Sequence, residues 1–144
     1  MQPLKVNSIT STVYDCSMVE LPKVESPTGN ITSLNNSIDI PFDTKRIYYL
    51  YDVPGGVDRG GHAHKDLYQV VVAASGSFDI TLDDGVRKKT ITLNRPYFGL
   101  LVVPGIWREL TNFSSGAICL VLASSKYDEL DYLRDYQEFL ASKR

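Results

Sequence analysis

Six short apolar segments follow one another between Lys45 and Ser125, and no other feature of the chain constrains its fold more strongly. They are rich in Val, Ile, Tyr and Thr, as β-strands are, and they read RIYYLYDV, LYQVVVAAS, SFDITLDD, KKTITLN, YFGLLVVP and GAICLVLAS. Turn signals that contain glycine, such as ASG and DDG, separate several of them. Strands at this spacing, without helical segments between them, predict a sandwich or a barrel. We therefore expect an all-β fold that occupies residues 1–144 as one domain.

The two ends of the chain differ from this central region. The first forty residues are less regular and predict one or two strands joined by a loop around Ser26–Gly29. Near the C-terminus we expect a short helix that begins at about Asp128 and packs on the barrel. There, apolar residues recur every three to four positions, the period of an amphipathic helix: Leu130, Leu133, Tyr136, Phe139 and Leu140.

Charge and composition exclude several kinds of partner. The formal net charge is −2 at pH 7, so the chain lacks the basic surface that nucleic acids need. No apolar run approaches the ~20 residues of a membrane span, and the first residues contain no apolar core of a secretory signal. Cys16 and Cys119 lie far apart and predict reduced thiols rather than a disulfide scaffold. We expect a cytoplasmic protein with no nucleic-acid or membrane partner.

The chain has two histidines, and both lie in the segment DRGGHAHKDLYQ, as His62 and His64. Alternate residues of a strand point to the same side of a sheet, so an extended segment puts both imidazoles on one face, which in a small barrel can be the interior. The surrounding residues follow the first motif of the cupin superfamily, G-x5-H-x-H-x3/4-E-x6-G. Every spacing from Gly56 to Gly76 is kept, and Gln69 stands in place of the glutamate. The motif predicts a cupin jelly-roll barrel.

The second cupin motif corresponds to GLLVVPGIWRELTN, in which Arg108 takes the place of a histidine. The usual ligand set of two His, one Glu and one His thus becomes His62, His64, Gln69 and Arg108. A glutamine offers a weak neutral carbonyl, and an arginine offers only N–H donors and a fixed positive charge. We therefore expect no metal and no other cofactor. A barrel mouth with imidazoles and guanidinium groups suits proton transfer on an anionic or carbonyl-bearing substrate.

Each of these residues also has a structural interpretation. The two histidines can be hydrogen-bonded core residues or the remnant of a metal site. Arg59 and Arg108 can be solvated or ion-paired as readily as they can bind a ligand. Trp107, the only tryptophan, can pack in the core or stack on a substrate.

Over about residues 38–139 the chain resembles the dTDP-sugar 3,4-ketoisomerases, a WxcM-like family of the cupin superfamily. The resemblance is carried by the segments RGGHAHK, PGIW and LASSKYDELDY. It implies the conversion of dTDP-4-keto-6-deoxyglucose to a 3-keto-6-deoxyhexose without a metal, in the biosynthesis of N-acylated amino sugars for surface polysaccharides. It also implies an intimate homodimer in which N-terminal strands exchange between subunits.

The resemblance carries the functional positions onto Tyr48, Arg59, His62, His64 and Arg108. A 4-ketone acidifies the proton on C3 of the sugar, and a neutral imidazole can remove that proton to give an enediolate. The most economical assignment makes His64 the base at carbon and lets His62 and Tyr48 handle the sugar oxygens. Arg59 or Arg108 would then stabilise the developing negative charge.

The remaining expected site residues bind the substrate. The diphosphate requires Arg or Lys partners, and Arg59 and Lys65 are the candidates. Arg108, Trp107, Gln69 and Thr28 complete the expected binding set. Thr28 stands before a glycine, at a position where family members carry a large residue that helps to set the product configuration. A further departure from the family is Gly61, where a bulky aromatic residue is usual.

Three other functions remain open at this point. A 3,5-epimerase acting on the same 4-keto sugar would need a base on each face of the ring, commonly a histidine and an opposing tyrosine. A non-catalytic cupin would bind a nucleotide sugar or another small ligand without turnover. A metal-dependent oxygenase is the weakest alternative, because it would require a tightly bound transition metal.

Overall fold

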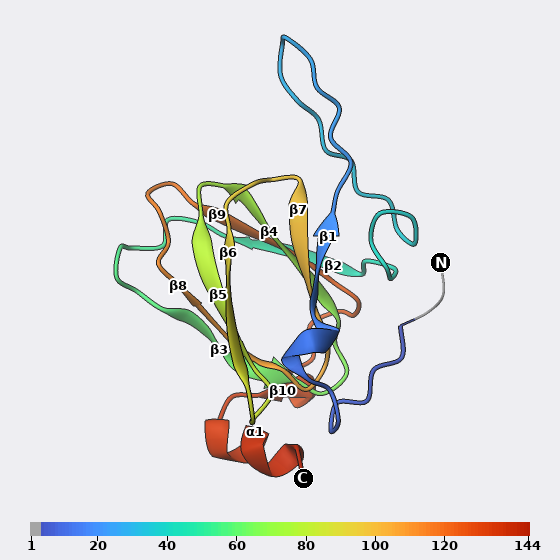
Figure 1. The fold of residues 1–144 in the computed structure, drawn as a ribbon, viewed down its shortest axis with the longest axis vertical. Helices are drawn as coiled ribbons and strands as arrows, with labels where there is room; N and C mark the ends of the chain where they lie inside the picture. Colours follow the sequence, from blue (N-terminus) through green and yellow to red (C-terminus); the bar gives the residue numbers. More distant parts are fainter. Residues whose placement is uncertain (1–3) are drawn as a thin grey trace.

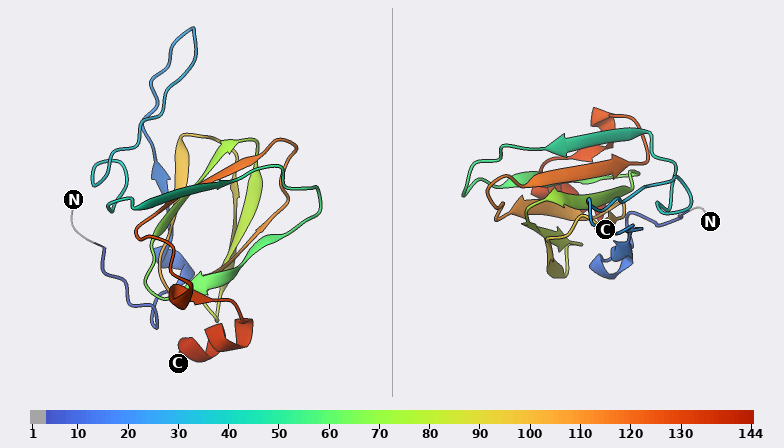
Figure 2. Two further views of the ribbon diagram at one scale, coloured as in Figure 1. Left: turned by 180° about the vertical axis from the view of Figure 1, so that it is seen from behind. Right: turned by 90° about the horizontal axis from the view of Figure 1, so that it is seen from above.

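The computed structural model describes residues 4–144, which form a barrel of two antiparallel five-stranded sheets (Figure 1). The strand order is β1-β7-β4-β9-β2 in one sheet and β10-β3-β8-β5-β6 in the other. Figures 1 and 2 show the two sheets facing each other around a common interior. The predicted all-β jelly-roll barrel with a short C-terminal helix is confirmed. In chain order the elements are η1 (Val13–Asp15), β1 (Ser17–Glu20), β2 (Arg46–Leu50), β3 (Arg59–His64), β4 (Gln69–Ser75), β5 (Phe78–Asp83), β6 (Lys88–Leu93), β7 (Phe98–Val102), β8 (Trp107–Thr111), β9 (Ile118–Ala123), η2 (Glu129–Asp131), β10 (Tyr132–Leu133) and α1 (Tyr136–Ser142).

The core of the barrel is apolar and takes side chains from both sheets. Phe78, Ile80 and Leu82 alternate along β5 and are each at most 1% exposed, as the pattern SFDITL predicts. They belong to one apolar cluster with Val71 of β4 and Leu100 of β7, which lie on the other sheet. Burial of this apolar surface, at about 25 cal/mol per Å², is the main force that holds the two sheets together.

An arm, defined here as residues 21–33, follows β1 and projects from the barrel. Val24 and Ile31 form an isolated antiparallel bridge, and the Gly29 amide donates to the Ser26 carbonyl at 3.0 Å to close the tip. Figure 1 shows the arm and α1 at opposite ends of the barrel. The N-terminal region thus contains β1 and this bridged loop, close to the predicted strands and turn.

The C-terminal helix begins later than the sequence predicts. It spans Tyr136–Ser142, and Asp135 caps it by accepting a hydrogen bond from the Glu138 amide at 3.0 Å. The stretch from Asp128 forms η2 and β10 instead, and Leu130 is 82% exposed. The predicted start at Asp128 is wrong because β10 pairs with the edge of β3, where its backbone groups find partners that outweigh the local helical pattern.

Helix α1 packs against the outer side of the second sheet at one end of the barrel. Phe139 is fully buried against Ala63 and Trp107, and this outer cluster is separate from the barrel core. Cys16 and Cys119 are buried free thiols, as expected. Within residues 4–144, no helix has both the length and the apolar character needed to cross a bilayer.

Candidate active site

A row of polar side chains lines the interior face of the second sheet. His62 pairs in register with Arg108 of β8, and His64 pairs with Tyr132 of β10. Paired residues of neighbouring strands share a face, so these four side chains lie on the same side of the sheet. A β-bulge at Gly60, with φ +89°, shifts the register of β3 just before the histidines. The prediction that both histidines share a face is therefore confirmed. That face is the interior one, because Arg108 also pairs with Leu82 of the barrel core.

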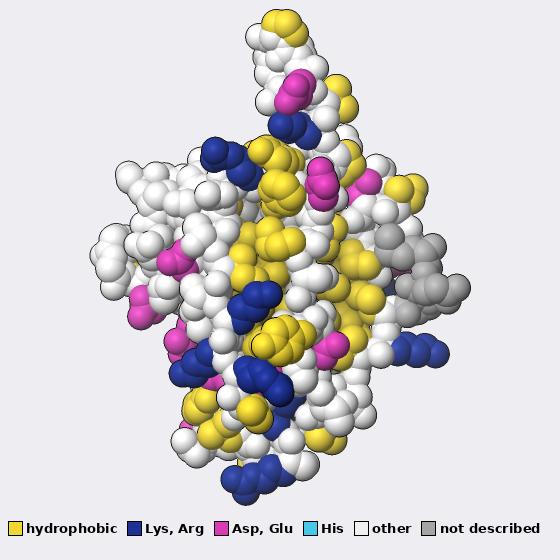
Figure 3. All heavy atoms as spheres, in the orientation of Figure 1, with side chains coloured by type: hydrophobic (Ala, Val, Ile, Leu, Met, Phe, Trp, Pro, Cys, Tyr) yellow, Lys and Arg dark blue, Asp and Glu magenta, His cyan; other side chains and the backbone are white. Residues whose placement is uncertain are grey.

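The two imidazoles lie against each other and under one tyrosine ring. Their ring centroids are 4.9 Å apart in an edge-to-face arrangement, and the Tyr132 ring lies 4.3 Å from His64 and 5.2 Å from His62. Among residues 4–144, neither histidine Nε2 atom has a hydrogen-bond partner, although both atoms are buried. No histidine is visible on the face drawn in Figure 3. Buried polar atoms without partners are rare in proteins and are candidates for ligand contacts.

Both imidazoles are neutral at pH 7. Burial, together with the positive charge of Arg108 and the neighbouring ring, lowers the pKa of His62 to about 2. Burial lowers the pKa of His64 to about 4, although its hydrogen bond to Asp131 acts in the opposite direction. A neutral imidazole can accept a proton, which is the property that the expected reaction needs.

Asp131 lies against His64 and is held there by the backbone. Its Oδ2 atom is 2.9 Å from His64 Nδ1, and its Oδ1 atom accepts a hydrogen bond from the Asp66 amide at 2.7 Å. The Lys65 amide donates to the Asp131 carbonyl at 3.0 Å. Burial by itself would raise the pKa of Asp131, but the hydrogen bonds from His64 and from the backbone outweigh it and lower the pKa. The carboxyl group is therefore ionised at neutral pH.

A hydrogen-bonded chain crosses the barrel from one sheet to the other. Arg108 Nη1 donates to Gln69 Oε1 at 2.5 Å, and Gln69 Nε2 donates to the Tyr48 hydroxyl at 3.1 Å. Arg108 also donates from Nε and Nη2 to the Ile106 carbonyl, at 3.2 Å each. Arg108 is 3% exposed, and burial lowers its pKa, whereas burial raises the pKa of Tyr48. These hydrogen bonds hold the positive charge of Arg108 beside the histidines.

The cupin fold implies a metal, but these donors do not fit one. Gln69 Oε1 already accepts a hydrogen bond from Arg108, whose guanidinium stands where a third histidine would bind the ion. A divalent cation would be repelled by that positive charge at short range. No step below is therefore derived through a metal.

A small cavity borders the histidine row, the name used here for His62, His64, Arg108 and Tyr132. It has a volume of about 130 Å³, and His64, Asp131, Tyr132 and Arg46 are among the residues that line it. The Arg46 guanidinium lies 4.6 Å from the centroid of the Tyr48 ring, and Arg46 therefore places a second positive charge next to the row. The combination of neutral imidazoles, a tyrosine hydroxyl and fixed cations is suited to proton transfer on an anionic substrate.

The two expected diphosphate ligands lie at the surface. Arg59 begins β3 opposite Leu110, and Lys65 follows directly after its last residue. Both side chains are exposed, so neither belongs to the buried histidine row.

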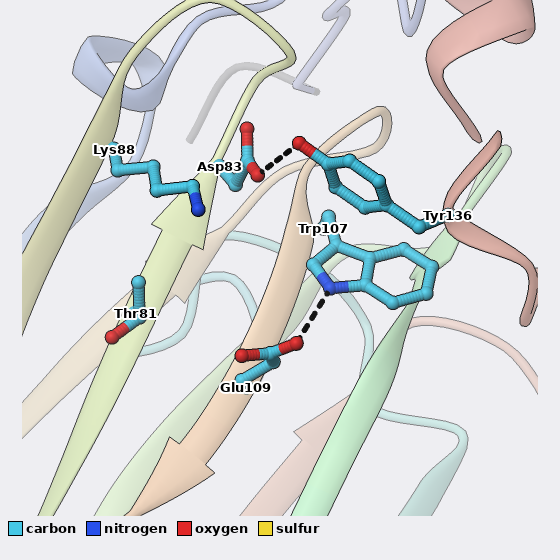
Figure 4. A pocket seen from close by; sticks show the side chains of 6 residues that line it. All are labelled: Thr81, Asp83, Lys88, Trp107, Glu109 and Tyr136. Carbon is cyan, nitrogen blue, oxygen red and sulfur yellow. Dashed lines mark hydrogen bonds between the residues drawn. The ribbon is translucent and has the colours of Figure 1, made fainter.

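Trp107 lies on the outer face of β8 and not with the histidines. Its ring centroid is 5.3 Å from that of Tyr136 and 5.8 Å from that of Phe139, and Nε1 donates to Glu109 Oε1 at 3.3 Å. Of the two roles that the sequence left open, this position gives Trp107 packing contacts with α1. It also lines an outer cavity of about 200 Å³ that contains no residue of the histidine row and is bordered by Thr81, Asp83, Lys88, Trp107, Glu109 and Tyr136 (Figure 4).

The two departures from the family pattern also lie away from the histidines. A Cβ atom added to Gly61 would meet the Trp107 ring at 3.6 Å, so an aromatic residue there would extend the outer cluster. Thr28 lies exposed at the tip of the arm, where its hydroxyl is 2.9 Å from that of Ser26. Within one chain, Thr28 therefore does not reach the histidine row.

Three residues of the site were not predicted from the sequence: Asp131, Tyr132 and Arg46. The first two belong to the segment KYDELDY, which carries part of the family resemblance but was assigned to a helix. The signal available in the sequence is a polar residue of the family motif that has no role in forming a helix, because such a residue is a candidate for the site. Nothing in the sequence marks Arg46 as a site residue, because it is the first residue of an ordinary strand.

Comparisons with known proteins agree on one family. The family described as "FdtA: WxcM-like, C-terminal" matches residues 14–144. A curated relative, the TDP-4-oxo-6-deoxy-alpha-D-glucose-3,4-oxoisomerase of Aneurinibacillus thermoaerophilus, is 43% identical over 122 residues, which are 85% of this chain and 88% of the relative. A 3,4-ketoisomerase structure from Helicobacter canadensis is 46% identical, with a TM-score of 0.86 over 88% of this chain and 96% of that one.

Two further structures come from QdtA, a 3,4-ketoisomerase of Thermoanaerobacterium thermosaccharolyticum. One is a histidine-to-asparagine variant in complex with TDP-4-keto-6-deoxyglucose, 38% identical to this chain, with a TM-score of 0.90 over 92% of this chain and 96% of that one. The other is a double variant in complex with TDP, in which a tyrosine is replaced by arginine and an arginine by histidine. It is also 38% identical, with a TM-score of 0.89 over the same shares of both chains.

Proposed function

This chain belongs to the FdtA family of WxcM-like proteins, and we propose that it is a 3,4-ketoisomerase that converts dTDP-4-keto-6-deoxyglucose to a dTDP-3-keto-6-deoxyhexose. Relatives that are named for this activity, or solved with its substrate, are 38–46% identical to it. The observation that carries the proposal is the pair of neutral imidazoles, which are buried beside a fixed guanidinium and have no partner at Nε2 among residues 4–144. Such a pair can accept protons where negative charge develops.

We assign the carbon step to His62, in contrast to the sequence-based assignment to His64. His62 is partly exposed, whereas His64 is fully buried and engaged with Asp131. The residue spacing in QdtA supports the same choice. The histidine replaced in its substrate complex and the arginine replaced in its double variant are separated by the same number of residues as His62 and Arg108. His62 would thus remove the proton from C3 and return it at C4.

The sugar oxygens would be handled by Tyr48 and His64. As the enediolate collapses, the C3 hydroxyl loses a proton and the C4 oxygen gains one, so a group that can both accept and donate must lie beside them. The Tyr48 hydroxyl is held by Gln69, and the guanidinium of Arg108 is held by the same glutamine, in position to stabilise the enediolate charge. The diphosphate of the substrate would add negative charge that opposes the Arg108 field and would raise the low pKa of His62 toward the working pH.

The nucleotide would bind at the surface end of the row. Lys65 follows the last residue of β3, and Arg46 adds a cation at the cavity, so the diphosphate has cationic partners on two elements at this end. Arg59 begins β3 at its other end and would contact a different part of the substrate. Thr28 can contact the substrate only if the arm of a second copy of the chain reaches this site. In QdtA, the replaced tyrosine precedes the replaced arginine by the same interval as Thr28 precedes Arg108.

A homodimer is therefore part of the proposal. The arm stands away from its own barrel, and Ile47 and Tyr49 of the edge strand β2, followed by Tyr51, are exposed by 61%, 58% and 61%. Figure 3 also shows apolar side chains gathered over β1 and β7. Apolar surfaces of this kind commonly mark interfaces. Light scattering coupled to size-exclusion chromatography should give twice the chain mass, and a monomer at micromolar concentration would contradict the dimer.

The activity is tested with dTDP-4-keto-6-deoxyglucose in deuterium oxide. We expect deuterium at C3 of the recovered substrate and at C4 of the product, read by NMR and mass spectrometry, and a 3-amino sugar when a 3-aminotransferase is added. Deuterium at C5 would indicate a 3,5-epimerase instead. Tight binding of the nucleotide sugar without any exchange would indicate a non-catalytic binding protein. A 3-amino product in this assay would place the chain in the biosynthesis of N-acylated amino sugars.

A further inference from the structure

We infer that Asp131 is a positioning residue that holds His64 in the tautomer with its proton on Nδ1, so that Nε2 presents a lone pair to a hydroxyl group of the sugar. The catalytic part of this inference rests on the proposed isomerisation. The tautomer itself rests only on the geometry around the carboxylate.

An ionised carboxylate can only accept hydrogen bonds. Asp131 Oδ2 lies 2.9 Å from His64 Nδ1, so Nδ1 must be the donor in that contact. A neutral imidazole carries one N–H group, and its other nitrogen is then an acceptor. Nε2 of His64 is therefore the free acceptor, and it is also one of the two buried imidazole nitrogens that lack a partner within residues 4–144.

The surroundings keep both partners in this arrangement. The backbone amides of Asp66 and Lys65 bond to the carboxylate and the carbonyl of Asp131, so the residue cannot rotate away without losing both bonds. The His64 ring is fully buried between the Tyr132 ring at 4.3 Å and the His62 ring at 4.9 Å. A ring packed on two sides in this way is hindered from turning over, and its tautomer is then set by the carboxylate.

The tautomer matters because the isomerisation moves a proton between two oxygens. In our scheme the O–H bond of the C3 hydroxyl breaks and its proton passes to His64 Nε2, as the ketone forms at C3. The same proton then passes from Nε2 to the oxygen on C4, so the imidazole returns to its neutral form. While His64 carries both protons, the Asp131 carboxylate balances its charge. The opposite tautomer would present an N–H group to the C3 hydroxyl and could not accept that proton.

The substitution Asp131→Asn tests this with almost no change in shape. The asparagine oxygen can keep the hydrogen bond from the Asp66 amide, which turns the NH2 group toward His64 Nδ1. An N–H donor at that place requires Nδ1 to accept, so the proton moves to Nε2. The matched control is Asp135→Asn, which makes the same chemical change four residues later, at a helix cap that contacts no histidine and where asparagine caps as well as aspartate does.

Two measurements are needed for each variant. Long-range proton–nitrogen NMR correlations report which imidazole nitrogen carries the proton, and with only two histidines in the chain the His62→Asn spectrum assigns the signals. Steady-state kinetics with dTDP-4-keto-6-deoxyglucose separate kcat from KM. We expect the Nδ1–H form of His64 in the unsubstituted protein and in Asp135→Asn, and the Nε2–H form in Asp131→Asn. We also expect Asp131→Asn to lower kcat on the order of 10²-fold or more, with little change in KM.

Three results would overturn the inference. The first is an Nε2–H form of His64 in the unsubstituted protein, which needs no variant and holds even if Asp131→Asn fails to fold. The second is a switched tautomer in Asp131→Asn with kcat unchanged. The third is a loss of kcat in Asp131→Asn that leaves the tautomer as it was and follows a drop in the unfolding midpoint, as a purely structural residue would cause. If the unsubstituted chain turns over no 4-keto sugar, the proposed function fails, whereas the NMR result still decides the tautomer.

Discussion

The strands β3 and β8 have two faces that differ sharply in chemistry, although consecutive residues supply them. On the outer face, Ala63 and Trp107 pack with Phe139 of α1 in a closed apolar cluster. On the inner face, His62 and Arg108 meet across the same two strands among polar groups. Burial does not distinguish the two faces, because Trp107 is 7% exposed and Arg108 only 3%.

The two faces differ in whether their buried polar atoms have hydrogen-bond partners. The outer side chains make the contacts that their apolar surfaces require, and the indole nitrogen has a partner in Glu109. The inner histidines each keep one nitrogen without a partner within residues 4–144, at a cost in stability. We therefore expect the inner face to control turnover and the outer face to control stability, and the four predictions below test that division.

The largest expected effect is on turnover, through His62→Asn. Removing a positioned general base typically lowers the rate by roughly 10²–10⁴-fold, so kcat should fall by that factor. The unfolding midpoint should change little, because the lost Nε2 atom has no hydrogen-bond partner in the part of the chain that the structure describes. The control on the outer face is Phe139→Leu, for which we expect the reverse pattern: kcat is retained and the midpoint falls. If His62→Asn keeps its turnover, the proposed carbon base is wrong.

The largest expected effect on stability comes from Phe139→Ala. Phe139 is fully buried in the outer cluster, and truncating such a residue costs about 3–5 kcal/mol in the free energy of unfolding. Urea denaturation measures this change, and kcat measured well below the transition should stay close to that of the unsubstituted protein. A selective loss of kcat in fully folded Phe139→Ala would show that the two faces are coupled.

Acid should destabilise the protein through the inner face. The folded state lowers the pKa of His62 from 6.5 to about 2 and that of His64 from 6.5 to about 4, so between pH 6.5 and these values the unfolded chain binds more protons. The stability that depends on neutral histidines is thus complete above pH 6.5 and is lost as the pH falls, with a contribution from His64 on the order of 3 kcal/mol by pH 4.

Urea unfolding at several pH values between 8 and 4 measures this loss. His62→Asn should show a shallower decline than the unsubstituted protein, whereas Phe139→Leu should decline in parallel with it. If the free energy of unfolding falls equally steeply with pH in all three proteins, the histidines have ordinary pKa values in the folded state.

The smallest expected effect is at the cap of α1. Asp135→Ala removes the acceptor for the Glu138 amide and should lower the free energy of unfolding by about 0.5–2 kcal/mol, with kcat unchanged. Asp135→Asn should leave the stability nearly as it is. A loss of turnover in Asp135→Ala without a loss of stability would contradict the assignment of α1 to a structural role.

The inner and outer faces were not equally predictable. The period of two correctly placed both histidines on one face of β3, and Phe78, Ile80 and Leu82 on one face of β5, because alternation is a local property of a strand. The same alternation in β8 puts Trp107 and Arg108 on opposite faces of the sheet. The helical period that begins at Leu130 predicted too early a start for the C-terminal helix, because β10 pairs with β3 there instead.

By itself, the sequence determined an all-β barrel, a shared face for His62 and His64, and a donor set of Gln69 and Arg108 that suits no cation. Only the tertiary structure decided which residues meet those histidines. Asp131 bonds to His64 across 67 residues of chain, and Arg108 reaches Tyr48 through Gln69 on the opposite sheet. The physical reason is that side-chain alternation is fixed by local backbone geometry, whereas contacts between distant segments depend on strand pairing and on how the sheets close around the core.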